Sequence, residues 1–183
     1  MSQEASRKAL QAKYLGMSLE LNRLERHNVE YFGYCAKGEF RLQKCRHCGL
    51  LRYPPGSACP WCARDEFDWA LVEGRGTVYS YFEVRHAIQP AFQPFVPYLV
   101  LLVELDEQSG APSAGEALRV VGNLVAADGT LARPDLVQQV GIGTRVRMRL
   151  VPAGRELGLP QWQVDGGAPQ ARPWRYPGQS ENR

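Results

Sequence analysis

The sequence predicts a mainly β protein with helices at its N-terminus, and two hydrophobic patterns support this prediction. Before residue 41 the apolar residues follow the spacing of a helix, whereas after residue 72 they alternate with polar residues at the period of a strand. Four of the five cysteines lie between these two regions. The changes of pattern predict a helical arm, a cysteine-rich unit, a β domain and a flexible tail, at residues 1–40, 41–71, 72–165 and 166–183.

The N-terminal arm is expected to contain two helices. Residues 3–14 and 18–37 have helical patterns and are separated near Gly16. A loose apolar stripe runs along the second segment, and Lys37-Gly38 has the pattern of a helix end. An arm of this kind either packs on its own domain or docks onto a partner, and the sequence leaves both alternatives open.

The cysteines form two Cys-x-x-Cys pairs, Cys45 with Cys48 and Cys59 with Cys62, with ten residues between the pairs. Two residues between cysteines allow a tight turn that directs both sulfurs at one ion, and two such turns complete the tetrahedron that zinc accepts. Gly49 fits the first turn because glycine tolerates positive φ. Four thiolates leave zinc no open position for water or substrate. We therefore expect one structural zinc ion per chain, whose binding energy contributes to folding.

Two residues near this block have alternative interpretations. His47 lies inside the first turn, where it is either a solvated side chain or a substitute metal ligand. Cys35 is either a small packing residue or a reactive thiol. We expect a cytoplasmic, non-membrane protein with reduced thiols. The number of cysteines is odd, no apolar run approaches roughly 18 residues, and the N-terminus lacks the apolar core of a signal peptide.

Five segments after the cysteine block have the periodicity of strands. They are residues 77–85, 98–105, 118–126, 144–151 and 161–165. A short helix is expected at residues 134–140, between the third and fourth strands. This order of elements is that of a five-stranded OB-fold barrel. The last 18 residues are rich in proline and glycine, so we expect them to be flexible.

The connection between the first two strands, residues 86–97, is long, apolar and rich in proline. It carries Phe92 and Phe95 on a stiff segment that either forms a recognition surface or folds back over one end of the barrel. His86 at its start and Tyr98 just after its end are further candidates for ligand or partner contact. The alternative for His86 is an ordinary hydrogen-bonded loop histidine.

A helix, a four-cysteine ribbon and an OB barrel in this order resemble one family of acyl-CoA-associated proteins. Its members have a rubredoxin-like zinc ribbon and an OB-fold and are known as domain of unknown function 35. The matching segments, between residues 29 and 165, are "LQKCRHCGLLRYPPGSACPWC", "EGRGTVYSYFEVRHA", "PYLVLLVEL", "RVVGNLV" and "IGTRVRMRL". The resemblance implies that the zinc ligands are Cys45, Cys48, Cys59 and Cys62.

The resemblance also implies a function. Family members typically work as a scaffold or an acyl-CoA channel beside a thiolase-like catalytic subunit that forms or cleaves C–C bonds. The chain would then be inert alone but a required subunit of an acyl-CoA acyltransferase or aldolase hetero-oligomer, with a coenzyme A thioester as a shared ligand. Three arginines that alternate along the fourth strand, Arg145, Arg147 and Arg149, would suit the phosphates of CoA. Their alternative interpretation is a solvated strand face.

Other classes of function have weaker support in the sequence. The chain has no Gly-rich phosphate loop, no G-x-S-x-G motif and no His-Glu metal helix, and the spacing of its three histidines suggests no nucleophile–base pair. An OB-fold nucleic-acid-binding protein is the main alternative, because Tyr79 and Tyr81 would share one strand face for base stacking. The net charge of +3 is low for that class, so nucleic acid is the less favoured partner.

Overall fold

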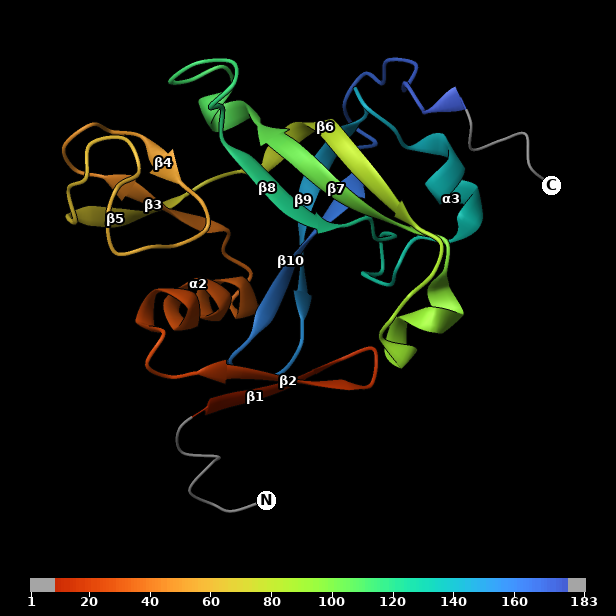
Figure 1. The fold of residues 1–183 in the computed structure, drawn as a ribbon, viewed down its shortest axis with the longest axis horizontal. Helices are drawn as coiled ribbons and strands as arrows, with labels where there is room; N and C mark the ends of the chain where they lie inside the picture. The colour runs from red at the N-terminus through yellow and green to blue at the C-terminus, as the bar shows by residue number, and fades with distance from the viewer. Residues whose placement is uncertain (1–8, 178–183) are drawn as a thin grey trace.

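The computed structural model describes residues 9–177, and within them the chain is mostly β with two α-helices (Figure 1). The strands form three antiparallel sheets in chain order. A two-stranded hairpin comes first, a three-stranded sheet around the cysteines follows, and a five-stranded sheet completes the fold. The predicted class, mainly β with a cysteine-rich ribbon ahead of a five-stranded domain, is confirmed.

The N-terminal segment forms a hairpin instead of the first predicted helix. Strands β1 (Ala9–Tyr14) and β2 (Met17–Asn22) pair with each other. The helix prediction is therefore wrong for the residues in these strands, while residues 3–8 lie outside the described part of the chain. The two turn residues, Leu15 and Gly16, have φ of 51° and 80°, which is the conformation that a tight two-residue hairpin turn requires.

Tertiary packing explains why the hairpin prevails over helix propensity. Good helix formers occupy the outward positions of β1, whereas every second residue, Leu10 and Ala12 among them, is buried. These residues pack with Ala153 and Leu157 from the connection between the last two strands. The N–H of Lys13 also donates to the carbonyl of Ala153 over 2.8 Å, so the hairpin is bonded to the β domain.

Helix α2 (Arg26–Ala36) packs on strand β10 (Gly158–Val164). Contact is very close at Gly158, where an added Cβ would lie 2.4 Å from the carbonyl carbon of Cys35. Cys35 itself is 3% exposed and belongs to the main hydrophobic core. Burial raises the pKa of its thiol to about 12, so it is a packing residue with very little thiolate near neutral pH.

We expect Gly158→Ala to destabilise the fold, because the new methyl group overlaps the backbone of α2 and strand and helix must move apart. Overpacking of this kind costs about 1–3 kcal/mol of the free energy of unfolding. Thermal or denaturant unfolding measures the change. Gly154→Ala is the matched control, because its Cβ would meet Ala12 at an ordinary 3.6 Å. Equal stability of the two variants would contradict the close contact between α2 and β10.

The cysteines lie on a small sheet of three strands, ordered β4-β3-β5. These are β3 (Arg41–Cys45), β4 (Leu51–Arg52) and β5 (Phe67–Leu71). The side chain of Gln108 joins this ribbon to the β domain, since its amide accepts a hydrogen bond from the N–H of Leu51 and donates one to the carbonyl of the same residue. Gln108 is buried, so the joint is shielded from water.

The β domain is a five-stranded sheet ordered β10-β9-β6-β7-β8. The strands not yet given are β6 (Arg75–Val84), β7 (Tyr98–Leu105), β8 (Arg119–Asn123) and β9 (Arg145–Pro152). The predicted short helix is present as α3 (Pro134–Gln139), and two 3-10 turns, η1 (Pro90–Phe95) and η2 (Asp106–Gln108), flank β7. The five strands and the helix therefore follow the predicted order.

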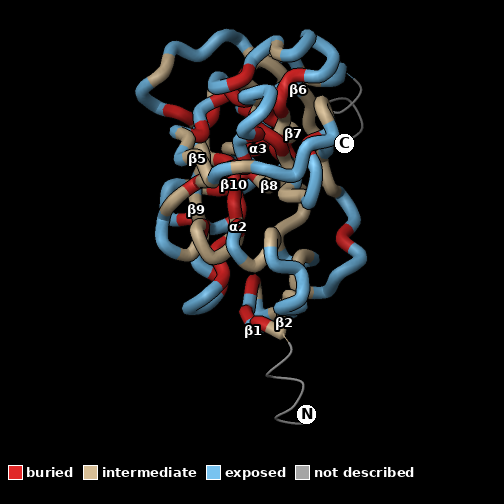
Figure 2. The backbone as a smooth tube through the Cα atoms, turned by 90° about the vertical axis from the view of Figure 1, so that its left-hand side faces the viewer, coloured by how far each residue is buried: buried red, intermediate tan, exposed pale blue. Residues whose placement is uncertain are grey.

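The main core lies inside this curved sheet and beneath α2. Figure 2 shows the buried stretches gathered in the middle of the molecule, along β6, β7, β10 and α2. Trp162 is fully buried there and donates its indole N–H to the carbonyl of Val120. Among the described residues, the two edge strands meet at an isolated bridge between Leu124 and Trp162, so the predicted barrel is not closed by a continuous ladder.

Residues 166–177 lie against the β domain. The backbone of Trp174 pairs with that of Ile142, and the side chain of Gln170 bonds the backbone of Arg145. The flexibility of the tail stays a prediction, and its last residues, 178–183, lie outside the described part of the chain. No helix among residues 9–177 is long and apolar enough to cross a membrane.

Candidate functional site

The four cysteine sulfurs lie close together, as predicted. The Sγ atoms of Cys45, Cys48, Cys59 and Cys62 all lie within 4.8 Å of one another. Two of the separations, Cys45–Cys62 and Cys48–Cys59, are 3.6 Å. A tetrahedron of Zn–S bonds about 2.3 Å long places its sulfurs about 3.8 Å apart, so the cluster fits zinc. The cysteines are free thiols, and 3.6 Å is far longer than a disulfide bond.

Two similar turns position these sulfurs. In the first, the N–H of Gly49 donates to the carbonyl of Cys45, and in the second the N–H of Ala63 donates to that of Cys59. Both turns end in the left-handed region, with φ of 75° at Gly49 and 60° at Ala63. Sequence reasoning identified Gly49 but missed Ala63, because alanine carries no sequence signal for positive φ.

The turns also supply hydrogen-bond donors to sulfur. The N–H of Cys48 is the largest cause of a Cys45 pKa that is lowered to about 6, and the N–H of His47 adds to it. A thiolate is the form that binds metal, so these amides favour the liganding state of the sulfur. His47 is exposed and lies outside the group of four cysteines that could hold a metal ion.

A buried arginine holds the connection between the two turns. Arg52 is 3% exposed and donates to the side-chain oxygen of Gln43 and to the carbonyl of Gly56. The same Gln43 oxygen accepts the N–H of Gly56. The guanidinium also lies over the ring of Phe67 at 4.8 Å. Sequence analysis missed this clamp, because nothing in the local pattern marks Arg52 and Gln43 as buried.

The proline-rich loop folds back on the protein at Phe92. The Phe92 ring is half-buried, with its centroid 5.4 Å from that of Tyr98 and 6.0 Å from that of Tyr14 in the hairpin. Phe95 is also half-buried, whereas His86 is exposed. The structure thus brings Phe92 and Tyr98 together and places His86 apart on the surface.

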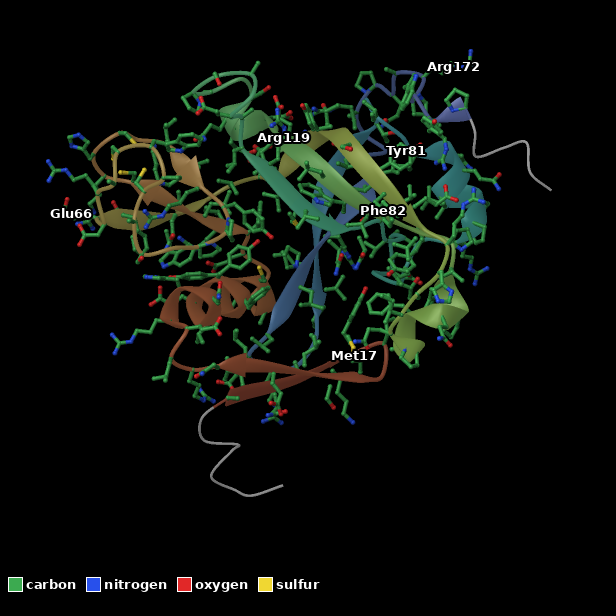
Figure 3. All side chains as sticks on the ribbon, in the orientation of Figure 1. Met17, Glu66, Tyr81, Phe82, Arg119 and Arg172 are labelled. Atoms are coloured by element: carbon green, nitrogen blue, oxygen red, sulfur yellow. The ribbon has the colours of Figure 1, made fainter. Side chains whose placement is uncertain are left out.

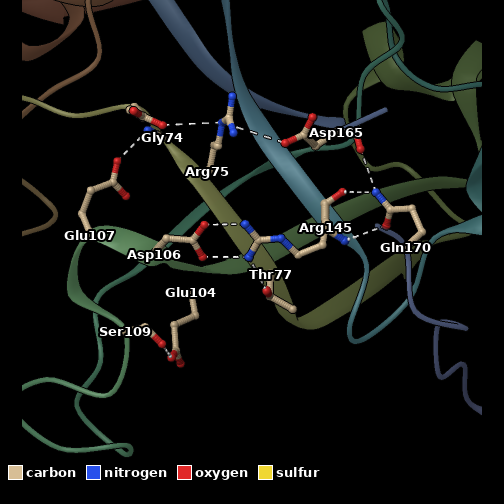
Figure 4. A network of polar contacts seen from close by, with 11 residues as sticks. Gly74, Arg75, Thr77, Glu104, Asp106, Glu107, Ser109, Arg145, Asp165 and Gln170 are labelled. Atoms are coloured by element: carbon tan, nitrogen blue, oxygen red, sulfur yellow. Dashed lines mark hydrogen bonds and ion pairs between the residues drawn. The ribbon is translucent and has the colours of Figure 1, made fainter. Parts of the chain in front are cut away.

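The three arginines of β9 have different surroundings. Arg145 forms a two-pronged ion pair with Asp106 and also donates to the hydroxyl of Thr77 (Figure 4). The Arg145 guanidinium holds the pKa of Asp106 below its ordinary value. Arg147 lies opposite Arg75 in the neighbouring strand, and both are exposed. Arg75 has carboxylate partners of its own, Glu73 at 3.6 Å and Asp165 at 4.0 Å, which offset the repulsion between the two like charges.

Arg149 lines an open pocket of about 460 Å³ between the ribbon and the β domain. The pocket surface is about half apolar and half polar. Its apolar side chains are Phe40, Leu71, Val72, Met148 and Leu150, and the carboxylate of Glu73 lines it together with Arg149. Leu71 is 64% exposed, although large apolar side chains are usually covered. A pocket with an apolar wall and a guanidinium has the features needed to hold an amphipathic anion.

A β-bulge separates the two tyrosines that were predicted to share a face. The pairing of β6 with β7 shifts between Val78 and Ser80, which leaves Tyr79 as the extra residue. Tyr79 is 51% exposed and stacks under the guanidinium of Arg119, whereas Tyr81 packs against the core and its hydroxyl accepts the N–H of Tyr176. The predicted Tyr79–Tyr81 stacking platform is therefore wrong.

Two family models match the chain over adjacent regions. Residues 32–68 match the rubredoxin-like zinc ribbon domain of ChsH2, and residues 69–151 match the C-terminal OB-fold domain of ChsH2. The matches agree with the cysteine sheet and with the five-stranded sheet described above.

Among solved structures, the chain resembles one from the Ltp2-ChsH2(DUF35) aldolase. The identity is 34% and the TM-score 0.58, over 76% of this chain and 94% of that one. Among curated proteins, it is 37% identical over 139 residues to a probable enoyl-CoA hydratase alpha subunit of Thermomonospora curvata, and 32% identical over 106 residues to a DUF35 domain-containing scaffold protein of Methanothermobacter thermautotrophicus. These matches cover 75% and 57% of this chain but 37% and 66% of the respective relatives.

Proposed function

The chain belongs to the ChsH2 (DUF35) family of zinc-ribbon and OB-fold proteins, and from this premise we propose that it is a non-catalytic scaffold subunit of an acyl-CoA-processing complex. Its partner is a thiolase-like catalytic subunit that forms or cleaves C–C bonds in acyl-CoA substrates. The observation that carries the proposal is the 34% identity, over 94% of the relative's length, to a chain of the Ltp2-ChsH2(DUF35) aldolase.

The zinc cluster supports a structural role in this proposal. The four cysteine sulfurs fill a tetrahedral site, so zinc held there has no position for water or substrate. A bound zinc ion would cross-link the two turns and would not act as a Lewis acid. The cysteines therefore hold the ribbon in shape and leave chemistry to the partner.

The pocket at Arg149 supports a direct contact with the acyl-CoA. CoA joins an apolar pantetheine arm to phosphates, and the pocket joins apolar walls to a guanidinium. Arg147 is a further exposed cation on the same strand, whereas Arg75 opposite it is paired with Glu73 and Asp165. Arg145 takes a different part, because Asp106 already neutralises it and the pair ties β9 to the η2 turn. The competing nucleic-acid function lacks its stacking platform, since Tyr79 and Tyr81 have different surroundings.

Co-expression tests the proposal. We expect the chain to purify as a stable stoichiometric complex with a thiolase-like protein of the same organism, when only one of the two carries an affinity tag. The complex should survive gel filtration and retain one zinc per copy of this chain. Separate elution of the two proteins, each folded, would overturn the proposed partnership.

A further inference from the structure

One side of the β6-β7-β8 sheet is mostly apolar although it faces outward, with Ser80 opposite Leu102 and Asn123 opposite Val100 as its polar residues. Six residues form this apolar face, and they are Phe82, Val84, Tyr98, Val100, Leu102 and Val121. Pairing places them next to each other, because Phe82 lies opposite Val100, Val84 opposite Tyr98, and Leu102 opposite Val121. The alternate residues of β7 are fully buried and face the core. From Tyr98 to Val103, the side chains on both sides of β7 are therefore largely apolar, although only one side is fully buried.

This composition is unusual for a sheet with one solvated side. Antiparallel sheets of this kind normally place polar residues outward. Here Phe82 is 67% exposed and Val121 45% exposed (Figure 3 labels Phe82). Among residues 9–177, the two hydrophobic core clusters take in Tyr81, Leu99 and Leu101 from the same strands but none of the six. Within residues 9–177, η1 covers the face at Tyr98, whereas Phe82 and Val121 remain exposed beyond it.

The charges at the border of the face are already neutralised. Glu104 and Arg119 form an ion pair at 3.0 Å at one end, and Arg119 also covers the ring of Tyr79 at 3.7 Å. Glu83 lies on the opposite side of β6, across from buried Leu99, where its carboxylate pairs with Arg175 and Arg85. A partner that covers the face would thus meet no unpaired charge, so the surface that complements it is apolar and uncharged at its centre.

The apolar face also continues into the proline-rich loop. Tyr98, at the end of the face nearest the loop, packs on Phe92 of η1, so the loop borders the face there. Aromatic side chains at the centre of such surfaces provide most of the binding energy in protein interfaces. Phe82 is the most exposed of the six and is therefore the expected anchor of the interface.

Resting on the proposed function, we infer that this apolar face is the surface that docks the thiolase-like subunit. The subunit would present a patch of aliphatic and aromatic side chains without a central charge. This occupant fits better than a second copy of the chain, because a related chain with 34% identity is found beside a different protein, in the Ltp2-ChsH2(DUF35) aldolase.

The test measures the affinity of the two purified subunits for each other, with variants of this chain. We expect Phe82→Lys combined with Val121→Lys to raise the Kd at least about 30-fold, since each removes an apolar contact and buries a charge. Phe82→Glu should weaken binding as well, because the loss does not depend on the sign of the charge. Phe82→Leu should retain most of the affinity.

The matched control is Leu24→Lys, at an apolar residue that is 85% exposed in the connection before α2, away from the face. It should bind like the unchanged chain. Zinc content and melting temperature of every variant show that the fold is intact.

Three results would overturn the inference. If the face variants bind as tightly as the control while the unchanged chain binds its partner, the docking surface lies elsewhere and the proposed function stands. If the chain alone is a dimer that Phe82→Lys converts to a monomer, the face belongs to a second copy. If the unchanged chain does not bind the thiolase-like protein at all, the proposed function fails and the inference fails with it.

Discussion

Replacement of Cys59 by serine should leave the chain unfolded or insoluble, whereas the unchanged protein should carry one equivalent of zinc. Cys59 is 2% exposed, and its sulfur lies 3.6 Å from that of Cys48. Structural zinc sites of this kind contribute about 10–16 kcal/mol of apparent binding free energy, which is folding free energy. A ribbon with so few buried side chains has no comparable core to replace it.

The same result is expected for Cys48→Ser, although Cys48 is exposed, because each sulfur occupies one of the four positions around the metal. Cys35→Ala is the matched control. It removes a cysteine that lies in the hydrophobic core rather than in the cluster, so the protein should lose some stability but retain its zinc. Metal analysis and circular dichroism measure both effects. A folded, soluble Cys59→Ser protein without metal would show that zinc does not hold the ribbon together.

The cysteine cluster and the strand order could be predicted because their signals are local. Each Cys-x-x-Cys pair is contained in one turn, and the alternation of Val146, Met148 and Leu150 with arginines directly indicates a strand with one buried side. The helix between the third and fourth strands has a proline at its first position, which marks where the helix begins. None of these predictions required knowledge of what the elements pack against.

The parts that were predicted wrongly depend on distant contacts. The hairpin at Leu10 and Ala12 exists because Ala153 and Leu157 cover it, and these residues are far along the chain. The bulge at Tyr79 reverses the outward direction of the following residues, so counting by two from Tyr79 assigned Tyr81 to the wrong side. The same bulge turns Phe82 outward, and simple alternation could not indicate this apolar face.

Activity in acyl-CoA C–C bond formation or cleavage should require both subunits. We expect this chain alone to be inactive, since its zinc site is closed. The thiolase-like subunit alone should be at least about 100-fold less active than the mixture, because a scaffold that positions substrate contributes on this scale when it is removed. Phe92→Ala with Phe95→Ala should reduce this gain while zinc content stays unchanged, because the two rings support the loop that borders the docking face.

The kinetic parameters of the mixture also decide whether CoA touches this chain. If the guanidiniums of Arg147 and Arg149 bind CoA phosphates, replacing both by alanine should raise the KM for the acyl-CoA at least about tenfold and leave kcat nearly unchanged. Loss of even one charged hydrogen bond costs roughly 1.5–3 kcal/mol of binding. Arg133→Ala, at an exposed arginine before α3, is the control and should change neither parameter. An unchanged KM would confine CoA to the partner and leave the scaffold role intact. Full activity of the partner without this chain would contradict the scaffold role itself, because nothing would then remain for the docked subunit to position.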